Sequence, residues 1–196
     1  MQPQQRIQDH FRSSIQTKEL ALDQLAGPIN DAANLLTRIL AQGNKILTCG
    51  NGGSAADAQH FASELLNRFE MERPPLPAMA LTTDSSTTTA IGNDESFRAI
   101  FAKPIRAVGR PGDVLLAFST SGNSDNIVEA VRVAHAVGMS VIAPSGRDGG
   151  SVAGQLRDGD HELRVPSDTT ARIQEVHLLI THCLCDLIDQ HRYGAP

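Results

Sequence analysis

Asp113–Phe118 (DVLLAF) runs directly into Ser119–Ser124 (STSGNS), so an apolar stretch of strand length ends in four hydroxyl side chains around one glycine. A strand that ends this way before a helix offers free backbone N–H groups, hydroxyl donors and the positive helix end to an anion. The stretch therefore predicts a phosphate-binding loop, called here the phosphate cradle (Ser119–Ser124). An ordinary helix N-cap is the alternative, but it needs only one hydroxyl.

Apolar runs and helical patterns alternate on both sides of the cradle. This alternation predicts an α/β fold in which a doubly wound, five-stranded parallel sheet is flanked by helices. The expected strands are Lys45–Cys49, Ala78–Leu81, Val114–Phe118, Ser140–Pro144 and Glu162–Val165. The expected helices are Ser54–Phe69, Phe97–Val108, Asn123–Val137, Ser151–Leu156 and Thr170–His191.

The first part of the chain predicts an N-terminal helical hairpin. One helix is expected over residues 4–25, with an apolar stripe, and a second helix from Pro28 to Gly43. We expect one domain over residues 1–196, in which residues 1–43 serve oligomerisation and residues 44–196 form the α/β core that holds the phosphate cradle. The stripe consists of Ile7, Phe11, Ile15, Leu22 and Leu25.

Composition excludes some classes of function. The 196 residues carry 17 basic and 22 acidic side chains, a net charge of -5, without a Lys/Arg-rich run, so we expect no direct nucleic-acid binding. The N-terminus lacks an apolar signal core and no run approaches membrane-spanning length, so we expect no membrane association. Three cysteines, with Cys49 in a buried strand, suit a reducing compartment and predict a cytoplasmic protein.

Two further polar loops follow predicted strands, where ligands bind in open α/β sheets. Gly50–Ser54 (GNGGS) has glycines that permit positive φ and close backbone approach to a ligand, although a tight turn capped by Ser54 explains it equally well. Residues 82–89, followed by Asn93 and Asp94, could satisfy a polyhydroxylated ligand or be an ordinary solvated loop.

Helical spacing brings together a second set of side chains. His60 and Glu64 lie four apart on one helix face, nearly opposite its apolar residues, and Gln174 and His182 share a stripe on the last helix. An exposed surface His/Glu pair is the alternative. His177 falls nearer the apolar side, which predicts a hydrogen-bonded structural role. No partner at a meaningful spacing is found for His10, His135, His161 and His191.

Two imidazoles, one carboxylate and one amide oxygen make a plausible site for a divalent metal, and zinc suits such nitrogen and oxygen ligands. Both faces point away from the core of their own chain. We therefore expect a neighbouring copy of the chain to bury the site at a subunit interface.

These residues together resemble a known family. The phosphate cradle is similar to the phosphosugar-binding signature of SIS (sugar isomerase) domains. Gly50–Ala55, His60 with Glu64, Asn93-Asp94, and Arg172–His177 followed by His182 resemble the bacterial phosphoheptose isomerases. The resemblance runs almost end to end. It implies a cytoplasmic homotetramer with one zinc ion per subunit, which converts D-sedoheptulose 7-phosphate to D-glycero-D-manno-heptose 7-phosphate for lipopolysaccharide core synthesis.

The resemblance also implies roles for individual residues. It implies zinc ligation by His60, Glu64, Gln174 and His182. It implies substrate binding by Asn51, Gly52, Gly53, Glu64, Asn93, Asp94, Ser119, Thr120, Ser121, Ser124 and Gln174. Ketose–aldose isomerisation needs a base to move a proton between adjacent carbons and an acid for the oxygens. We expect Glu64 to be the base and His182 the acid.

One relative within the same fold is an adaptor, the protein that associates with the replication initiator DnaA. Stretches such as Asn67–Glu70 and Cys183–Asp189 resemble that adaptor as well, but they describe the scaffold rather than the chemistry. An adaptor has no reason to keep the acid/base set, and a sugar-phosphate sensor would need the cradle without Glu64. The isomerase is therefore favoured, and binding to DnaA is the alternative.

Overall fold

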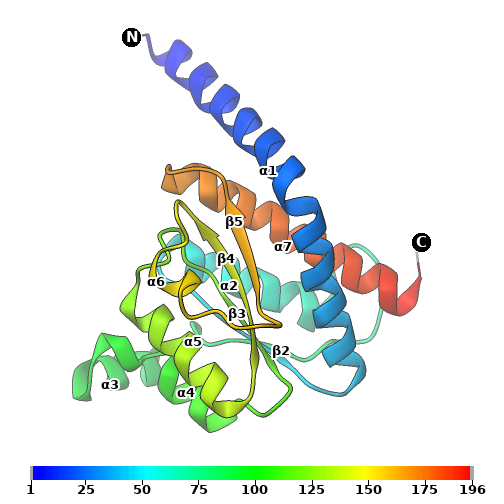
Figure 1. Cartoon of the computed structure of the whole chain (residues 1–196), viewed down its shortest axis with the longest axis vertical. Helices are drawn as coiled ribbons and strands as arrows, with labels where there is room; N and C mark the ends of the chain where they lie inside the picture. The colour runs from blue at the N-terminus through cyan, green and yellow to red at the C-terminus, as the bar shows by residue number, and fades with distance from the viewer. Residues whose placement is uncertain (1, 195–196) are drawn as a thin grey trace.

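The computed structural model describes residues 2–194 and contains one five-stranded sheet with helices on both faces (Figure 1). The strand order is β2-β1-β3-β4-β5, and all four neighbouring pairs are parallel. The predicted doubly wound parallel sheet is confirmed. The strands are β1 (Ile46–Cys49), β2 (Ala78–Ala80), β3 (Val114–Ala117), β4 (Ser140–Gly146) and β5 (His161–Val165).

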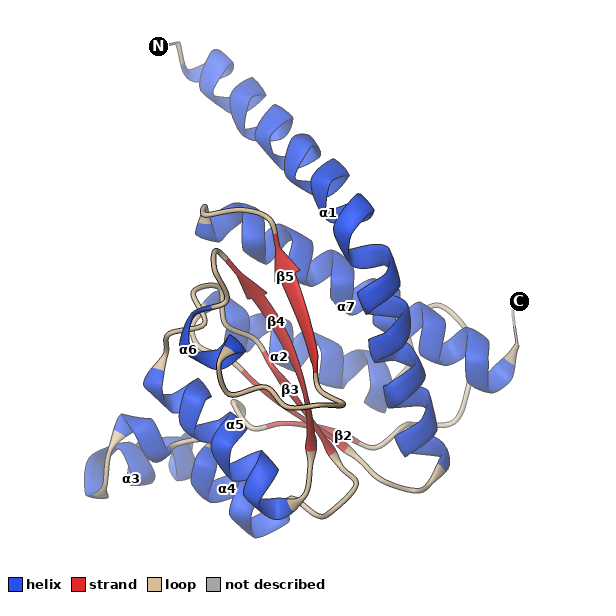
Figure 2. Cartoon of the chain, in the orientation of Figure 1, coloured by secondary structure: helices blue, strands red, loops and turns tan. Residues whose placement is uncertain are grey.

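The helices divide between the two faces of this sheet, as Figure 2 shows. Successive strand residues point to opposite faces, so Ile46 belongs to a core cluster with α1, α2 and α7, and Leu47 to a cluster with α4, α5 and α6. The helices are α1 (Pro3–Ala41), α2 (Gly53–Leu66), α3 (Ser85–Asp94), α4 (Ala102–Val108), α5 (Asp125–Val137), α6 (Gly150–Ala153) and α7 (Thr170–Tyr193), with a 3₁₀ helix η1 (Phe97–Ala99). No helix among the described residues is both long and apolar enough to cross a bilayer.

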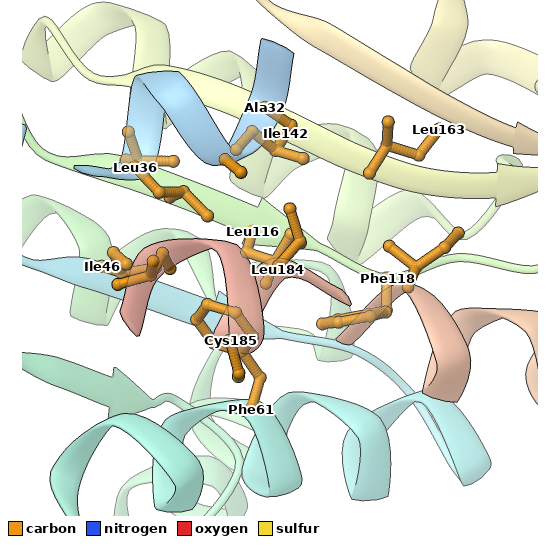
Figure 3. Close-up of a cluster of buried hydrophobic side chains, with 14 of the residues drawn as sticks. Ala32, Leu36, Ile46, Phe61, Leu116, Phe118, Ile142, Leu163, Leu184 and Cys185 are labelled. Carbon is orange, nitrogen blue, oxygen red and sulfur yellow. The ribbon is translucent and has the colours of Figure 1, made fainter. Parts of the chain in front are cut away.

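The core beneath α1, α2 and α7 fixes how these helices sit on the sheet. Figure 3 shows Leu36, Phe61 and Leu184, one from each helix, gathered with the strand residues Ile46 and Leu116. All five side chains are completely buried. Burying a side chain of this size stabilises a fold by roughly 1.5–3 kcal/mol, so this layer positions α2 and α7 firmly against each other.

The predicted N-terminal hairpin is wrong, because residues 3–41 form the single helix α1, with Pro28 inside it. A proline within a helix costs about 3 kcal/mol, since it lacks the N–H and crowds the preceding turn. Two features offset this cost. Gly27 has no Cβ to clash with the proline ring, and Leu25 and Ala32, on either side, are buried in the same core cluster. The axis of α1 changes direction partway along its length (Figure 1).

Two further segments differ from the prediction. Only the start of residues 82–89 is a loop: Asp84 caps a helix by accepting a 2.9 Å hydrogen bond from Thr87 N, and α3 begins at Ser85. The helix expected over Phe97–Val108 is divided into η1 and α4. A run of Ser and Thr has low helix propensity, so the helix forms here because of its cap and its packing against η1.

Candidate active site

The phosphate cradle leaves β3 and enters α5, as its sequence predicts. Ser119 Oγ accepts a 3.1 Å hydrogen bond from Gly122 N, and Ser121 Oγ accepts one of 3.2 Å from Asn123 N. Ser124 is the N-cap residue of α5, but its side chain makes no capping bond. Among the described residues, the backbone N–H groups of Thr120, Ser121 and Ser124 have no acceptor. The loop therefore presents free N–H and hydroxyl donors.

Gly122 gives the cradle its shape. Its φ is +65°, and a Cβ at this position would lie 1.8 Å from the carbonyl oxygen of Gly149. Both the left-handed backbone and this close approach exclude a larger residue. The loop that follows β4 is therefore packed directly behind the cradle and supports it.

The glycine loop (Gly50–Gly53) lies beside the cradle, because Cys49 and Ala117 are partners in neighbouring parallel strands. Asn51 and Asn126 join the two loops through reciprocal amide hydrogen bonds of 2.8 Å. Asn126 is 2% exposed, so its amide is shielded from water, whereas Asn51 is half-buried. Gly52 and Gly53 donate their N–H groups to no described acceptor. Sequence reasoning missed Asn126, whose only signal is a polar residue in the first turn of α5.

The predicted acid/base residues meet where α2 packs against α7. Nε2 of His60 lies 3.1 Å from Oε1 of Glu64 and 3.3 Å from Nε2 of His182. The ring of His182 also stacks on Phe69, with centroids 5.5 Å apart. The side chains of His60 and Glu64 are 38% and 22% exposed, so the cluster opens to the surface of the chain. We call His60, Glu64 and His182 the histidine–glutamate cluster.

Gln174 lies on the same side of α7 but further from the cluster. A Cβ at Gly53 would fall 2.5 Å from Gln174 Nε2, so the amide rests against the start of α2. Gln174 therefore contacts the glycine loop, and the structure does not place it against His60 or His182. The absence of a side chain at Gly53 is what makes room for the amide.

Asn93 and Asp94 stand apart from the other predicted site residues. They end α3, both are exposed, and Asn93 Nδ2 donates a 2.8 Å hydrogen bond to Asp94 Oδ1. The helix α3 buries none of its residues and packs against η1 (Figure 1). The structure thus gathers the glycine loop, the cradle, Gln174 and the histidine–glutamate cluster, but it leaves Asn93 and Asp94 outside.

A buried arginine lies beneath the cluster. The Arg73 guanidinium donates to the carbonyl oxygens of Glu64 and Leu65, each at 2.8 Å, and to Asp189 Oδ1 at 2.6 Å. The Arg73 side chain is fully buried and that of Asp189 is 6% exposed. These contacts hold the last turn of α2 against α7, and with it the backbone of Glu64.

Two histidines outside the cluster, His177 and His135, make side-chain contacts of their own. His177 is buried and its Nε2 lies 3.0 Å from the carbonyl oxygen of Ser145, which confirms the hydrogen-bonded structural role predicted for it. Burial lowers the pKa of His177 to about 4, although the bond to Ser145 opposes the change. His135, for which sequence spacing indicated no partner, has a ring Nε2 that lies 2.8 Å from Asp160 Oδ2. This pair comes from tertiary contact between distant segments, so helical spacing does not reveal it.

Comparison with known proteins agrees with this fold. The sequence matches the family described as "SIS domain" over residues 9–146. The chain belongs to the SIS domain family.

Individual relatives show to which group within the SIS domain family the chain is similar. The chain is 62% identical to "Phosphoheptose isomerase" of Alkalilimnicola ehrlichii, covering 100% of both chains, and 60% identical to that of Shewanella loihica, covering 95% of this chain and 94% of the relative. A solved phosphoheptose isomerase from Francisella tularensis superposes with a TM-score of 0.95 at 52% identity, covering 97% of this chain and 100% of that one. Within the SIS family, the chain therefore belongs with the phosphoheptose isomerases.

Proposed function

We propose that the chain converts D-sedoheptulose 7-phosphate to D-glycero-D-manno-heptose 7-phosphate and so supplies heptose for lipopolysaccharide core synthesis. The observation that carries the proposal is that His60 and Glu64, on the helix α2 that starts at the glycine loop, meet His182 of α7 through His60. One end of this site offers anion donors and the other offers an acid/base pair, which is what isomerisation of a sugar phosphate requires. The names of the relatives described above support the same activity.

The cradle and the glycine loop would bind the phosphate. Hydroxyls of Ser119, Thr120, Ser121 and Ser124 and the free backbone N–H groups donate to its oxygens. The N-terminus of α5 adds favourable electrostatics, because the peptide dipoles of a helix place partial positive charge there. The phosphate then fixes where the far end of the sugar chain lies.

Glu64 and His182 would carry the proton transfers. Glu64 takes a proton from C1 of the open-chain ketose while His182 gives a proton to the C2 carbonyl oxygen, which forms an enediol. Glu64 then returns its proton to C2, and His182 removes the proton from the C1 hydroxyl, which gives the aldose. Each group ends in its starting protonation state. When Nε2 of His182 binds zinc, as proposed below, the proton that this ring gives and takes back would be the one on Nδ1. Positioned acid/base catalysis of this kind contributes about 10²–10⁴-fold.

The donor set at the cluster suits zinc, with one ion per subunit and His60, Glu64, Gln174 and His182 as the proposed ligands. Two nitrogens bound to one tetrahedral zinc lie about 3.3–3.4 Å apart, and the two Nε2 atoms are 3.3 Å apart. In the part of the chain that the structure describes, no group of three or more His, Cys, Asp or Glu side chains is already arranged as a complete site. Closure would need the Gln174 amide or a second subunit. Bound zinc would supply a Lewis acid that stabilises negative charge on the substrate oxygens.

We propose a homotetramer in which neighbouring subunits close the site. Ile7, Phe11, Ile15 and Leu22 on α1 are 55–68% exposed, which is unusual for a row of large apolar side chains. An apolar groove of about 290 Å³ between α1 and α7 continues this surface past Leu25 and Leu179. The half-exposed histidine–glutamate cluster also favours coverage by another copy. Sedimentation of the active protein as a monomer would overturn this part of the proposal.

We place the protein in the cytoplasm. The cysteines Cys49, Cys183 and Cys185 are free, which fits a reducing compartment. Burial raises the pKa of Cys49 to about 12, so this thiol stays protonated and unreactive.

Association with DnaA remains the alternative. It uses the same scaffold, but none of the relatives described above carries the name of an adaptor. The adaptor also gives no reason for the contacts between His60, Glu64 and His182.

The deciding experiment incubates the purified protein with D-sedoheptulose 7-phosphate and follows formation of the aldose phosphate, with metal analysis in parallel. We expect turnover, about one zinc per subunit, and loss of activity on chelation that zinc restores. Absence of product with zinc bound, together with measurable binding to DnaA, would favour the adaptor.

A further inference from the structure

Asp57 carries a buried carboxylate oxygen that nothing in the chain uses. The residue is 9% exposed, and its Oδ2 has no hydrogen-bond partner among the described residues. A buried polar atom without a partner is costly, and such atoms are few in folded proteins. An orphaned acceptor therefore calls for an explanation, and neither the cradle nor the histidine–glutamate cluster provides it.

The position of Asp57 on α2 relates it to the site. At about 100° per residue, Gly53, Asp57, His60 and Glu64 lie within about 60° of one another on one helix face. Asp57 is thus one turn beyond the glycine loop and one turn before His60. Burial raises the pKa of Asp57 to about 6, and the charge of His60 opposes this, which places the carboxyl within electrostatic reach of the cluster.

The facing helix leaves Asp57 free. Gly53 contacts Gln174, and His60 contacts His182, so α2 and α7 run parallel along this seam. By helical rise, Asp57 falls between these two contacts, near the level of Leu178 on α7, whose side chain offers no hydrogen-bond donor. Leu178 is 36% exposed, so the outer edge of the seam faces solvent at this level, while Asp57 Oδ2 lies buried behind it.

Distance along the helix shows what could occupy this level. At about 1.5 Å per residue, His60 is about 10 Å beyond Gly53, and Asp57 is about 6 Å beyond it. A sugar phosphate held by its phosphate at the glycine loop and cradle, with its reacting carbons at the histidine–glutamate cluster, must pass Asp57 with the middle of its chain. The groups that a sugar presents there are hydroxyls, which are good donors to a carboxylate.

We propose that Asp57 is a substrate-binding residue whose Oδ2 accepts a hydrogen bond from a hydroxyl in the middle of the sugar chain. This inference rests on the proposed isomerase function and adds a contact between its two ends. It would favour polyhydroxylated phosphates, because a ligand with a hydroxyl at this level satisfies the buried oxygen and one without it leaves the oxygen unpaired.

The test compares Asp57→Ala and the isosteric Asp57→Asn with Asp158→Ala, which removes an exposed loop carboxylate. Turnover of D-sedoheptulose 7-phosphate gives kcat and KM, and calorimetry in the Glu64→Gln background gives the Kd of the same sugar phosphate. Inorganic phosphate serves as the probe for the cradle alone, and the zinc content of each variant is measured. Circular dichroism checks that each variant is folded.

Loss of a hydrogen bond to a charged group predicts that Asp57→Ala weakens sugar-phosphate binding about tenfold or more. Asp57→Asn should give a smaller loss, and it remains informative if the alanine variant does not fold. Phosphate binding, zinc content and the Asp158→Ala variant should be unchanged.

Three outcomes would overturn the inference: unchanged Kd and KM in both Asp57 variants, equal weakening of sugar-phosphate and phosphate binding, or loss of zinc. Unchanged binding in a protein that isomerises normally refutes the role of Asp57 alone. A wild-type protein without turnover refutes the proposed function instead, and selective loss of sugar-phosphate binding still tests Asp57 in that case.

Discussion

Arg73 donates a 2.8 Å hydrogen bond from Nη2 to the carbonyl oxygen of Glu64. The same guanidinium pairs with Asp189, so the proposed catalytic base is tied through its backbone to α7. Removing one partner of a buried ion pair leaves the other charge uncompensated. The stability of the fold and the placement of Glu64 therefore depend on one side chain.

Arg73→Ala should lower the free energy of unfolding by about 3–5 kcal/mol, because it strands the buried Asp189 carboxylate. Urea unfolding followed by circular dichroism measures the change. Arg68→Ala is the matched control, since the Arg68–Glu72 pair is 44% and 88% exposed and such pairs contribute about 0–1 kcal/mol. Equal midpoints for the two variants would show that the buried pair is not needed.

Glu64→Gln should reduce kcat by about 10²–10⁴-fold, because an amide cannot accept the proton from C1. Binding of inorganic phosphate should be unchanged, since the cradle lies at the other end of the site. Glu72→Gln, an exposed change of the same kind, should keep full turnover. Near-normal activity in Glu64→Gln would falsify its assignment as the base.

Gly53→Ala should impair the site without unfolding the protein. The new Cβ would lie 2.5 Å from Gln174 Nε2, so the amide must move away from the glycine loop. Overpacking of this kind costs about 1–3 kcal/mol, and we expect kcat/KM to fall about tenfold or more.

Gly154→Ala is the control for this glycine, because its Cβ would meet Ser151 O at an ordinary 3.7 Å. Activity should stay at the wild-type level in this variant. If Gly53→Ala also kept full activity and zinc content, the position of Gln174 would be irrelevant to function.

The lowered pKa of His177 should make the folded protein less stable in acid. Its pKa is about 4 when folded and about 6.5 when unfolded, so only the unfolded chain takes up the proton between these values. The contribution is therefore fully present above pH 6.5 and is lost as the pH falls towards 4. At 1.36 kcal/mol per pKa unit, the loss is on the order of 3 kcal/mol.

His177→Gln should flatten the dependence of unfolding free energy on pH between about 6.5 and 4, although the variant is less stable overall. Denaturant titrations at several pH values measure this slope. The exposed His191→Gln should keep the wild-type slope. An unchanged slope in His177→Gln would mean that another group causes the acid sensitivity.

Much of the fold follows from local sequence. All five strands were predicted. The clearest are β1 and β3, which are wholly buried and therefore consist of largely apolar runs such as Val114–Ala117. The predicted hairpin was wrong at Pro28, where burial of residues on both sides outweighs the free-energy cost of a proline within a helix. The prediction of a loop at α3 was wrong for a similar reason, since the cap at Asp84 stabilises a segment of low intrinsic helix propensity.

The site was predicted where spacing on one helix determines geometry, and missed where it does not. His60 and Glu64 were identified because one helical turn brings them together. Asn126 pairs with Asn51, and His135 with Asp160, across large sequence separations that only the folded sheet closes. Asp57 lies on the predicted face but was passed over, because only burial reveals that its carboxylate lacks a partner.

The amide pair of Asn51 and Asn126 has an evolutionary consequence. The two amides satisfy each other and Asn126 is almost fully buried, so a change at position 51 leaves the Asn126 amide buried without its partner. Replacing both residues together therefore costs little stability, whereas replacing one of them alone destabilises the protein. Positions 51 and 126 should covary among homologous chains, and two loops distant in sequence should then evolve as a single inherited unit.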